Sequence, residues 1–184
     1  MTNGEEAEFT ALVQRQSRFV FRVAYAVLLN SYDAEDAAQE VFLKLYRNRG
    51  WRNLANERAF LARVAWRVAV DRRRPAQHAA FASLESGLTA NPVEDSPTPG
   101  PGPEQTLLAA DQHAIVHGLI DALPEELRLP LVLSSFDELS SREIGGILRI
   151  PEGTVRSRLV RARQLLREKL ASLQGSYFVE TRHA

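Results

Sequence analysis

The sequence predicts an all-α protein of two small helical domains joined by a flexible linker, with a helix-turn-helix in the C-terminal domain. Apolar residues recur at helical spacing on both sides of a Pro- and Gly-rich segment at 79–106. A capped short helix, a proline and an arginine-rich helix follow one another within 139–163. We therefore expect helical domains at 1–78 and 107–172, and a short tail at 173–184.

Charge is unevenly distributed along the chain, although the formal net charge is zero. Lysine and arginine outnumber acids in 42–74 and again in 139–170, which indicates two local basic surfaces. Cysteine is absent, so the sequence predicts no disulfide and no Cys-based zinc site. The acidic start lacks an apolar core, and no apolar run is long enough to span a bilayer, which favours a cytoplasmic protein without membrane insertion.

The first two helices are expected at 9–30 and from Asp33 to about Arg47. The first is apolar enough to be largely buried, and Asp33 is placed to cap the second. The outward face of the second helix combines a leucine with acids, an amide and an arginine: Asp36, Gln39, Glu40, Leu43 and Arg47. Such a mixture is typical of the centre of a protein-binding patch. A solvated helix face explains these residues equally well.

A loop at 48–56 leads into a third helix at about 57–74, which Asn56 is expected to cap. Trp66 points away from the apolar face of this helix. Its neighbours on that side are Arg63, Val70 and Arg73. A large aromatic side chain among arginines suits stacking on unpaired bases. The alternative is that Trp66 packs beneath a neighbouring helix.

Residues 79–106 are rich in Pro, Gly and Ser and contain no Lys or Arg, which predicts an extended linker. Helices are expected at 107–122 and about 124–136. Pro130 lies inside the latter, where proline kinks a helix or removes a hydrogen bond.

His113 and His117 have the i, i+4 spacing of zinc ligands, but no third ligand is obvious, so we expect neither a metal nor a cofactor. No catalytic motif is present, and the sequence does not predict an enzyme.

The helix-turn-helix is predicted from its caps and its turn. Ser140 and Glu143 have the spacing of a capping box, in which each side chain satisfies a free backbone N–H. A break is expected near residues 149–150, and Pro151 suits the first turn of the next helix. That second helix should end near Ser172.

The second helix of this motif has an apolar side and a polar, arginine-bearing side. The apolar side holds Val155, Leu159, Ala162, Leu166 and Leu170. The polar side holds Gly153, Ser157, Val160, Arg161 and Gln164, flanked by Arg156 and Arg158. In the major groove arginine can bind guanine, serine either base, and an apolar group a thymine methyl. A solvated basic helix is the alternative, but the caps, the turn and the basic face together favour DNA binding.

Four segments, in this order, resemble the extracytoplasmic-function (ECF) sigma factors, which are two-domain subunits of bacterial RNA polymerase. Residues 33–46 resemble the helix that binds the polymerase clamp helices, and 60–74 the helix that helps to open the promoter. Residues 123–136 and 139–166 resemble the domain that reads the minus-thirty-five element. The most specific match is IPEGTVRSRLVRAR at 150–163.

This resemblance implies core RNA polymerase and promoter DNA as partners, with an anti-sigma factor as a further candidate. It implies polymerase contacts by Asp36, Gln39 and Glu40, to which the outward-face argument adds Leu43. Contacts to the minus-thirty-five element are expected from Gly153, Thr154, Arg156, Ser157, Val160 and Arg161. The loop 48–56 matches the one that captures a flipped base of the minus-ten element. Minus-ten recognition and melting are expected from Trp51, Asn53, Asn56, Arg63, Trp66, Arg67 and Arg73.

The chain departs from the family pattern at Trp66, Arg67 and Glu138, where a basic residue, asparagine and glycine are usual. Its linker is also long and proline-rich for such a protein. We expect a promoter-specificity subunit whose C-terminal domain docks on duplex DNA while its N-terminal domain holds polymerase and melted strand. The alternative is a helix-turn-helix regulator that binds DNA without acting as a polymerase subunit.

Overall fold

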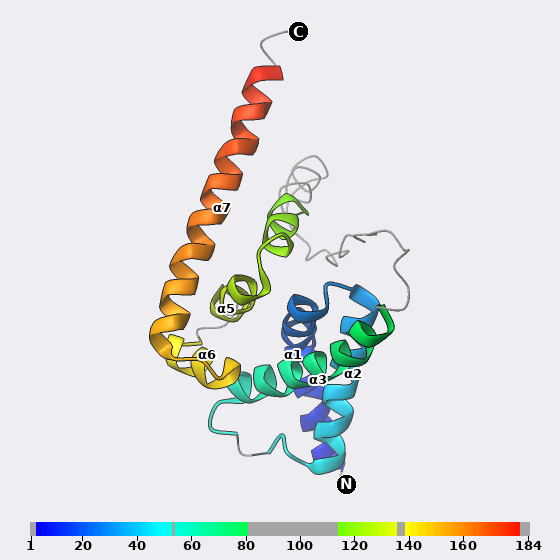
Figure 1. Ribbon diagram of the computed structural model, residues 1–184. Coiled ribbons are helices and arrows are strands. Elements are labelled where there is room, and N and C mark those ends of the chain that lie inside the picture. Colours follow the sequence, from blue (N-terminus) through cyan, green and yellow to red (C-terminus); the bar gives the residue numbers. More distant parts are fainter. Residues whose placement is uncertain (1–2, 53, 81–113, 136–138, 181–184) are drawn as a thin grey trace, which may run out of the picture.

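The computed structural model describes residues 3–52, 54–80, 114–135 and 139–180, and this described part is helical with no β-strand (Figure 1). The N-terminal module comprises α1 (Asn3–Leu28), α2 (Ser31–Asn48) and α3 (Glu57–Ala80). The C-terminal module comprises a helical segment at 114–121, α5 (Glu125–Ser135), α6 (Ser141–Leu148) and α7 (Glu152–Glu180). The predicted all-α fold is therefore confirmed. Of the linker expected at 79–106, only residues 79 and 80 are described, and they belong to α3.

The core of the N-terminal module forms where α2 and α3 pack on α1 and on each other. Branched apolar side chains of α1 meet small side chains of its neighbours, which lets the helices approach closely. The buried members include Val20, Val23, Val27, Ala34, Ala37, Val41, Leu61, Ala62 and Ala65. The apolar periodicity of the sequence is thus used for packing within this module.

The turn between α1 and α2 is set by Leu29 and Asn30. α1 ends at Leu28 because Leu29 takes the left-handed conformation, with φ of 53°. Asn30 then caps α2, and its side chain accepts a hydrogen bond from the Asp33 N–H at 3.1 Å. The expectation that Asp33 is the cap was therefore wrong. Asp33 lies in the first turn instead, where the helix dipole favours an acid.

The C-terminal module is built from α5, α6 and α7, which pack on one another. Pro130 lies within α5, as the sequence predicted, and its side chain is buried. The capping box of α6 is confirmed, because the Ser140 N–H donates to Glu143 and the Glu143 N–H donates to the Ser140 side chain. Pro151 directly precedes α7, and its carbonyl accepts from the Val155 N–H at 3.1 Å.

Helix α7 is longer than expected. It continues to Glu180 rather than ending near Ser172, and it projects well beyond α5 and α6 (Figure 1). No helix-stopping proline follows Pro151 in the sequence, and Gly175 alone does not end the helix. Most of the segment assigned to a tail, 173–184, is therefore helical.

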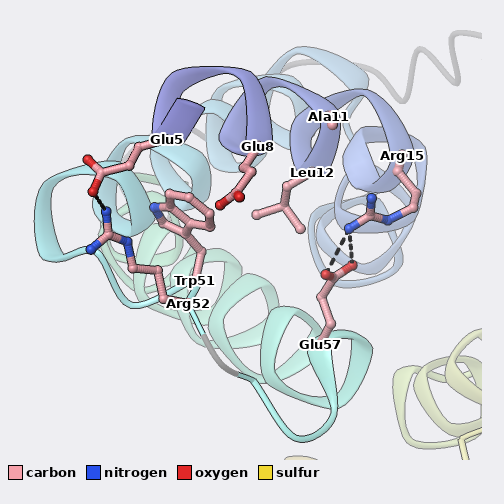
Figure 2. A pocket seen from close by; sticks show the side chains of 8 residues that line it. All are labelled: Glu5, Glu8, Ala11, Leu12, Arg15, Trp51, Arg52 and Glu57. Atoms are coloured by element: carbon pink, nitrogen blue, oxygen red, sulfur yellow. Dashed lines mark hydrogen bonds and ion pairs between the residues drawn. The ribbon is translucent and has the colours of Figure 1, made fainter. Parts of the chain in front are cut away.

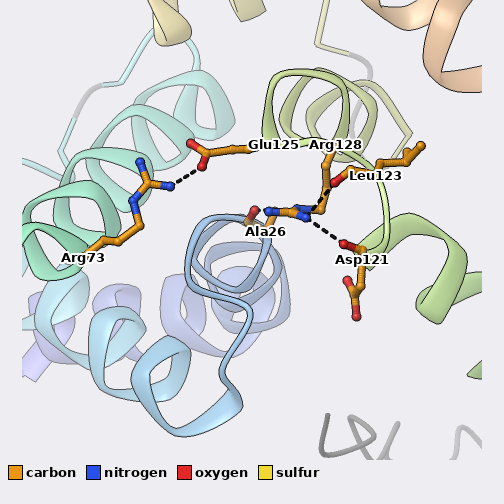
Figure 3. A network of polar contacts seen from close by, with 6 residues as sticks. All are labelled: Ala26, Arg73, Asp121, Leu123, Glu125 and Arg128. Atoms are coloured by element: carbon orange, nitrogen blue, oxygen red, sulfur yellow. Dashed lines mark hydrogen bonds and ion pairs between the residues drawn. The ribbon is translucent and has the colours of Figure 1, made fainter. Parts of the chain in front are cut away.

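The two modules pack directly on each other, α1 against α5 and α3 against α6. Arg128 of α5 is only 5% exposed and donates to the Ala26 carbonyl of α1 at 2.9 Å (Figure 3). The same guanidinium donates to the carbonyls of Asp121 and Leu123 at 2.8 and 2.9 Å. Burial lowers the pKa of Arg128, and the negative charge of Asp121 opposes this effect. The buried cation is thus satisfied mainly by backbone carbonyls from both modules.

A second polar contact between the modules joins Tyr25 of α1 to Asp121. The Tyr25 hydroxyl donates to the carboxylate at 3.0 Å. Burial, aided by the charge of Asp121, raises the pKa of Tyr25 to about 12, and burial also raises the pKa of Asp121. Two further pairs cross the same boundary: Arg73 with Glu125 (Figure 3) and Asn56 with Glu143.

Candidate protein-binding and nucleic-acid interfaces

The outward face predicted for α2 is exposed in the structure. Asp36 and Gln39 are exposed, Leu43 is 56% exposed, and Glu40 is half-buried. The face extends further than the sequence reading placed it, because Tyr32 lies one turn before Asp36 and is 72% exposed. Tyr32 was missed because the second helix was expected to begin at Asp33, whereas α2 begins at Ser31.

The acids on this face are held by basic side chains. Glu40 accepts a hydrogen bond from Arg72 of α3 at 2.8 Å and pairs with Lys44 at 2.7 Å. The hydrogen bond from Lys44 contributes most to lowering the pKa of Glu40, and Arg72 lowers it further. Arg72 also reaches Asp36 at 3.5 Å. Arg72 therefore fixes the geometry of this face from a neighbouring helix, which sequence spacing could not reveal.

The outer face of α7 has the composition that the sequence predicted. Gly153, Arg156, Ser157 and Arg161 are exposed, and Thr154 is half-buried. Val160 is 64% exposed, although it is apolar. The opposite side is the packing side, with Val155, Leu159 and Ala162 buried. A Cβ atom at Gly153 would meet nothing within 4 Å, so packing within the described structure does not require a glycine there.

Two arginines of α7 already have acidic partners. Arg156 pairs with Glu152 one turn earlier, and Arg158 reaches Glu126 of α5 at 3.4 Å. The Ser157 hydroxyl donates to the Thr154 carbonyl at 3.0 Å. Arg158 therefore connects α7 to α5.

The turn between α6 and α7 depends on a close backbone contact. Arg149 ends α6 in the left-handed conformation, with φ of 57° and ψ of 44°. The Ile150 N–H then donates to the Gly145 carbonyl at 3.0 Å. A Cβ atom at Gly145 would lie 2.8 Å from the Ile150 carbonyl oxygen, so only glycine fits this position. The sequence reading located this turn but did not identify the role of Gly145.

The residues proposed for minus-ten recognition differ in how exposed they are and in what they contact. Arg63 and Arg67 are exposed on α3, whereas Trp66 is half-buried and packs on the core, as the packing alternative expected. Arg73 pairs with Glu125. Asn56 caps α3, accepting from the Ala59 N–H at 2.9 Å. Asn53 lies outside the described residues.

Trp51 lies in a pocket between α1 and the loop that follows α2 (Figure 2). Its ring is tilted against Phe9 at a centroid distance of 5.5 Å, and the Arg52 guanidinium lies 5.5 Å from its centroid. Its indole N–H is buried and has no acceptor among the described residues. The pocket has a volume of about 480 Å³ and is lined by Glu5, Glu8, Ala11, Leu12, Arg15, Trp51, Arg52 and Glu57.

The described residues give no support for a membrane-spanning helix or a metal site. No described helix has the length and apolar character that crossing a bilayer requires. The described histidines and carboxylates form no group of three that could hold a metal ion. His117 is described, but His113 lies outside the described residues.

Both modules match known protein families. Residues 12–78 match sigma-70 region 2, and residues 113–166 match sigma-70 region 4. The chain is 34% identical over 160 residues to the ECF RNA polymerase sigma factor SigE of Mycolicibacterium smegmatis, covering 87% of this chain and 60% of that protein. It is 31% identical over 173 residues to the ECF RNA polymerase sigma factor SigW of Bacillus subtilis, covering 92% of each.

A solved structure shares the fold. The sigma factor RpoE of Bartonella quintana, in complex with the anti-sigma factor NepR, superposes with a TM-score of 0.69 over 89% of this chain and 97% of that chain. Sequence identity to RpoE is 17%, so this similarity shows the fold alone. Because it aligns with SigW over nearly its full length and carries sigma-70 regions 2 and 4 in order, the chain belongs to the ECF family of RNA polymerase sigma factors.

Proposed function

We propose that the chain is a promoter-specificity subunit in which the outer face of α2 binds core RNA polymerase and the outer face of α7 reads the minus-thirty-five element. One observation carries this proposal. Helices α2 and α7 each present a largely exposed aliphatic side chain, Leu43 at 56% and Val160 at 64%, on an otherwise polar outer face. Such side chains lose water only when a partner covers them, which stabilises the complex.

The polymerase-binding surface combines Leu43 with Asp36, Gln39 and Glu40. Arg72 holds Glu40 and Asp36 in place, so the acids are oriented before a partner arrives. Leu43 is the larger source of affinity, because exposed charged pairs contribute little. Its partner surface on polymerase should therefore contain an apolar patch.

The duplex-binding surface consists of Arg156, Ser157, Val160 and Arg161, with Gly153 and Thr154 at the start of α7. Gly153 has open space above it and permits close approach of DNA. The exposed side chains include an arginine for guanine and an apolar group for a thymine methyl. Minus-ten contacts are proposed first for Arg63 and Arg67, which are exposed. The other proposed contributors are Trp51, Asn53, Asn56, Trp66 and Arg73.

The partners proposed for the chain are core RNA polymerase and promoter DNA, in the cytoplasm. SigW and SigE are named as RNA polymerase sigma factors, which supports this choice. An anti-sigma factor is a further proposed partner, because RpoE, which has the same fold, was solved with one. Neither module needs high affinity for DNA alone, since polymerase makes the second contact effectively intramolecular.

The proposal is tested by transcription in vitro with core polymerase, with and without the chain. Replacing Leu43 with Ser should weaken polymerase binding about tenfold, because a buried leucine is worth roughly 1.5–3 kcal/mol. Leu173→Ser is the matched control, since Leu173 is an exposed leucine on α7 outside the proposed surfaces. A chain that binds its DNA tightly without polymerase, and is unaffected by Leu43→Ser, would instead be a regulator of the helix-turn-helix class.

A further inference from the structure

The exposed side of α6 carries two arginines separated by a glycine. Arg142, Gly146 and Arg149 follow at i, i+4 and i+7, so they share one side of the helix and its end. All three are exposed, whereas Ile144, Gly145 and Ile147 on the other side are buried. A Cβ atom at Gly146 would meet nothing within 4 Å. The α6 stripe, as we call these three residues, is therefore a basic surface with an open backbone at its centre.

Arg149 occupies a backbone conformation that is unfavourable for arginine. With φ of 57°, it caps α6 at a position where glycine or asparagine is usual. Strained residues of this kind persist mostly at functional sites. Leu29 has a similar φ of 53° after α1 but no charge, so it provides an internal comparison. Nothing in the packing of the described residues requires an arginine at position 149.

The charges of the α6 stripe are also available. Neither Arg142 nor Arg149 has an ion pair within the described parts of the chain. By contrast, Arg156 and Arg158 of α7 are paired with Glu152 and Glu126. The arginines of α6 can therefore bind an anion without first giving up a described partner.

The turn keeps Arg149 close to the start of α7. In a helix-turn-helix the start of the second helix lies in the major groove, which is about 8.5 Å deep, while the first helix crosses the backbone. Arg149 lies three residues before Glu152, the first residue of α7, which is at most about 10 Å of extended chain. If α7 enters the groove as proposed, Arg149 is therefore close enough to the start of α7 to reach the phosphates at the edge of the groove.

We propose that the α6 stripe binds the phosphate backbone beside the minus-thirty-five element, with Arg149 and Arg142 contacting phosphates on either side of Gly146. The inference rests on the proposed reading of duplex DNA by α7. Phosphate contacts position a protein on DNA without reading its sequence. The stripe therefore sets how tightly and in which register α7 docks, while Arg156 and its neighbours select the bases.

The test uses holoenzyme assembled from core polymerase and the full chain, with a promoter duplex selected by the wild type from a pool randomised at the minus-thirty-five element. Arg149→Gly relieves the backbone and removes the charge. It should raise the melting temperature of the chain by about 2–4 °C. It should also weaken binding about fivefold at 0.15 M salt and make the slope of log K against log salt shallower by about 0.9. The weakening should be equal on the selected duplex and on one with a scrambled element.

Three further variants separate the effect of the charge at position 149 from the effect of its backbone conformation. Leu29→Gly should raise the melting temperature without changing DNA binding, because it relieves the same conformation away from the stripe. Arg149→Lys should keep both the salt slope and the affinity, because it retains the charge. Arg142→Gln should lose one phosphate contact without any gain in stability.

Some outcomes overturn the inference. Unchanged affinity and salt slope in Arg149→Gly would show that Arg149 does not contact DNA, and a lower melting temperature would show that its side chain supports the fold. A loss confined to one promoter base pair would make it a base-reading residue instead. If wild-type holoenzyme selects no duplex at all, the proposed function itself fails, and Arg156→Ala will then also have no effect on selection.

Discussion

Gly145 and Gly146 are adjacent in α6, but replacing each with alanine should have opposite effects on stability. Gly145→Ala should destabilise the chain by about 1–3 kcal/mol, because its Cβ atom would lie 2.8 Å from the Ile150 carbonyl oxygen and the backbone must shift. Gly146→Ala should stabilise it by about 0.5–1 kcal/mol, because that site is open and alanine favours helix. Urea denaturation measures both, and equal effects would contradict this account of the turn.

Arg156 is the residue expected to read a base. Arg156→Ala should cost about 1–3 kcal/mol on the preferred promoter and relax the preference at one base pair. The measurement is transcription by holoenzyme from a set of promoters altered one base pair at a time. Arg163→Ala, another exposed arginine of α7, controls for loss of charge. An unchanged preference would remove Arg156 from the proposed reading surface.

At the scale of elements, the start of α6 depends on an ionised carboxylate. Hydrogen bonds from the Ser140 side chain and backbone lower the pKa of Glu143 below its ordinary value of 4.5. A group whose pKa is lower in the folded state contributes stability above its unfolded pKa and loses it as pH falls through the folded value. The capping box should therefore weaken below pH 4.5.

Melting curves between pH 7 and pH 3 measure this effect. Glu143→Gln can still cap α6 but cannot titrate, so it should lose less stability on acidification than the wild type. Glu8→Gln removes a carboxylate from α1 instead of from α6 and serves as the control. Identical pH profiles for Glu143→Gln and wild type would show that the carboxylate is not important for α6.

For the whole molecule, the contacts between modules conflict with the proposed simultaneous reading of both promoter elements. The elements are named for positions about 25 base pairs apart, which is about 85 Å of duplex. Asn56 is hydrogen-bonded to Glu143, and from Glu143 to Gly153 the chain covers at most about 25 Å. The modules must therefore separate before α7 and the minus-ten surface can engage one promoter together.

Tyr25→Phe should favour this separation. It removes the hydrogen bond to Asp121 and leaves a partly buried carboxyl without that partner, which should shift the balance between packed and separated modules roughly tenfold. Fluorescence energy transfer between labels in the two modules, or the radius of gyration in solution, reports the change. Tyr32→Phe is the control, because Tyr32 is exposed on α2. A radius of gyration identical to that of the wild type would show that Tyr25 does not hold the modules together.

Local patterns were enough to predict most helices, because periodicity, caps and prolines act within a few residues. The capping box at Ser140, the cap at Asn56 and the facing of Leu43 and Val160 followed from such patterns. Contacts between distant segments could not be predicted from such local patterns. Arg128 reaches Ala26 across the modules and Arg72 reaches Glu40 across helices, and no spacing rule pairs such residues. The cap at Asn30 was missed because the second helix was expected to begin at Asp33, two residues later than it does.

The pair formed by Arg156 and Glu152 bears on how the chain distinguishes promoters. If Arg156 reads a base as proposed, that base must outcompete the Glu152 carboxylate, which lies one turn away on the same helix. A mismatched base offers no such gain, so the guanidinium stays with its own helix and non-cognate DNA receives one contact fewer. Such an intramolecular rival reduces the net gain from the base contact, so it lowers affinity most at the preferred sequence and limits the discrimination that Arg156 can provide.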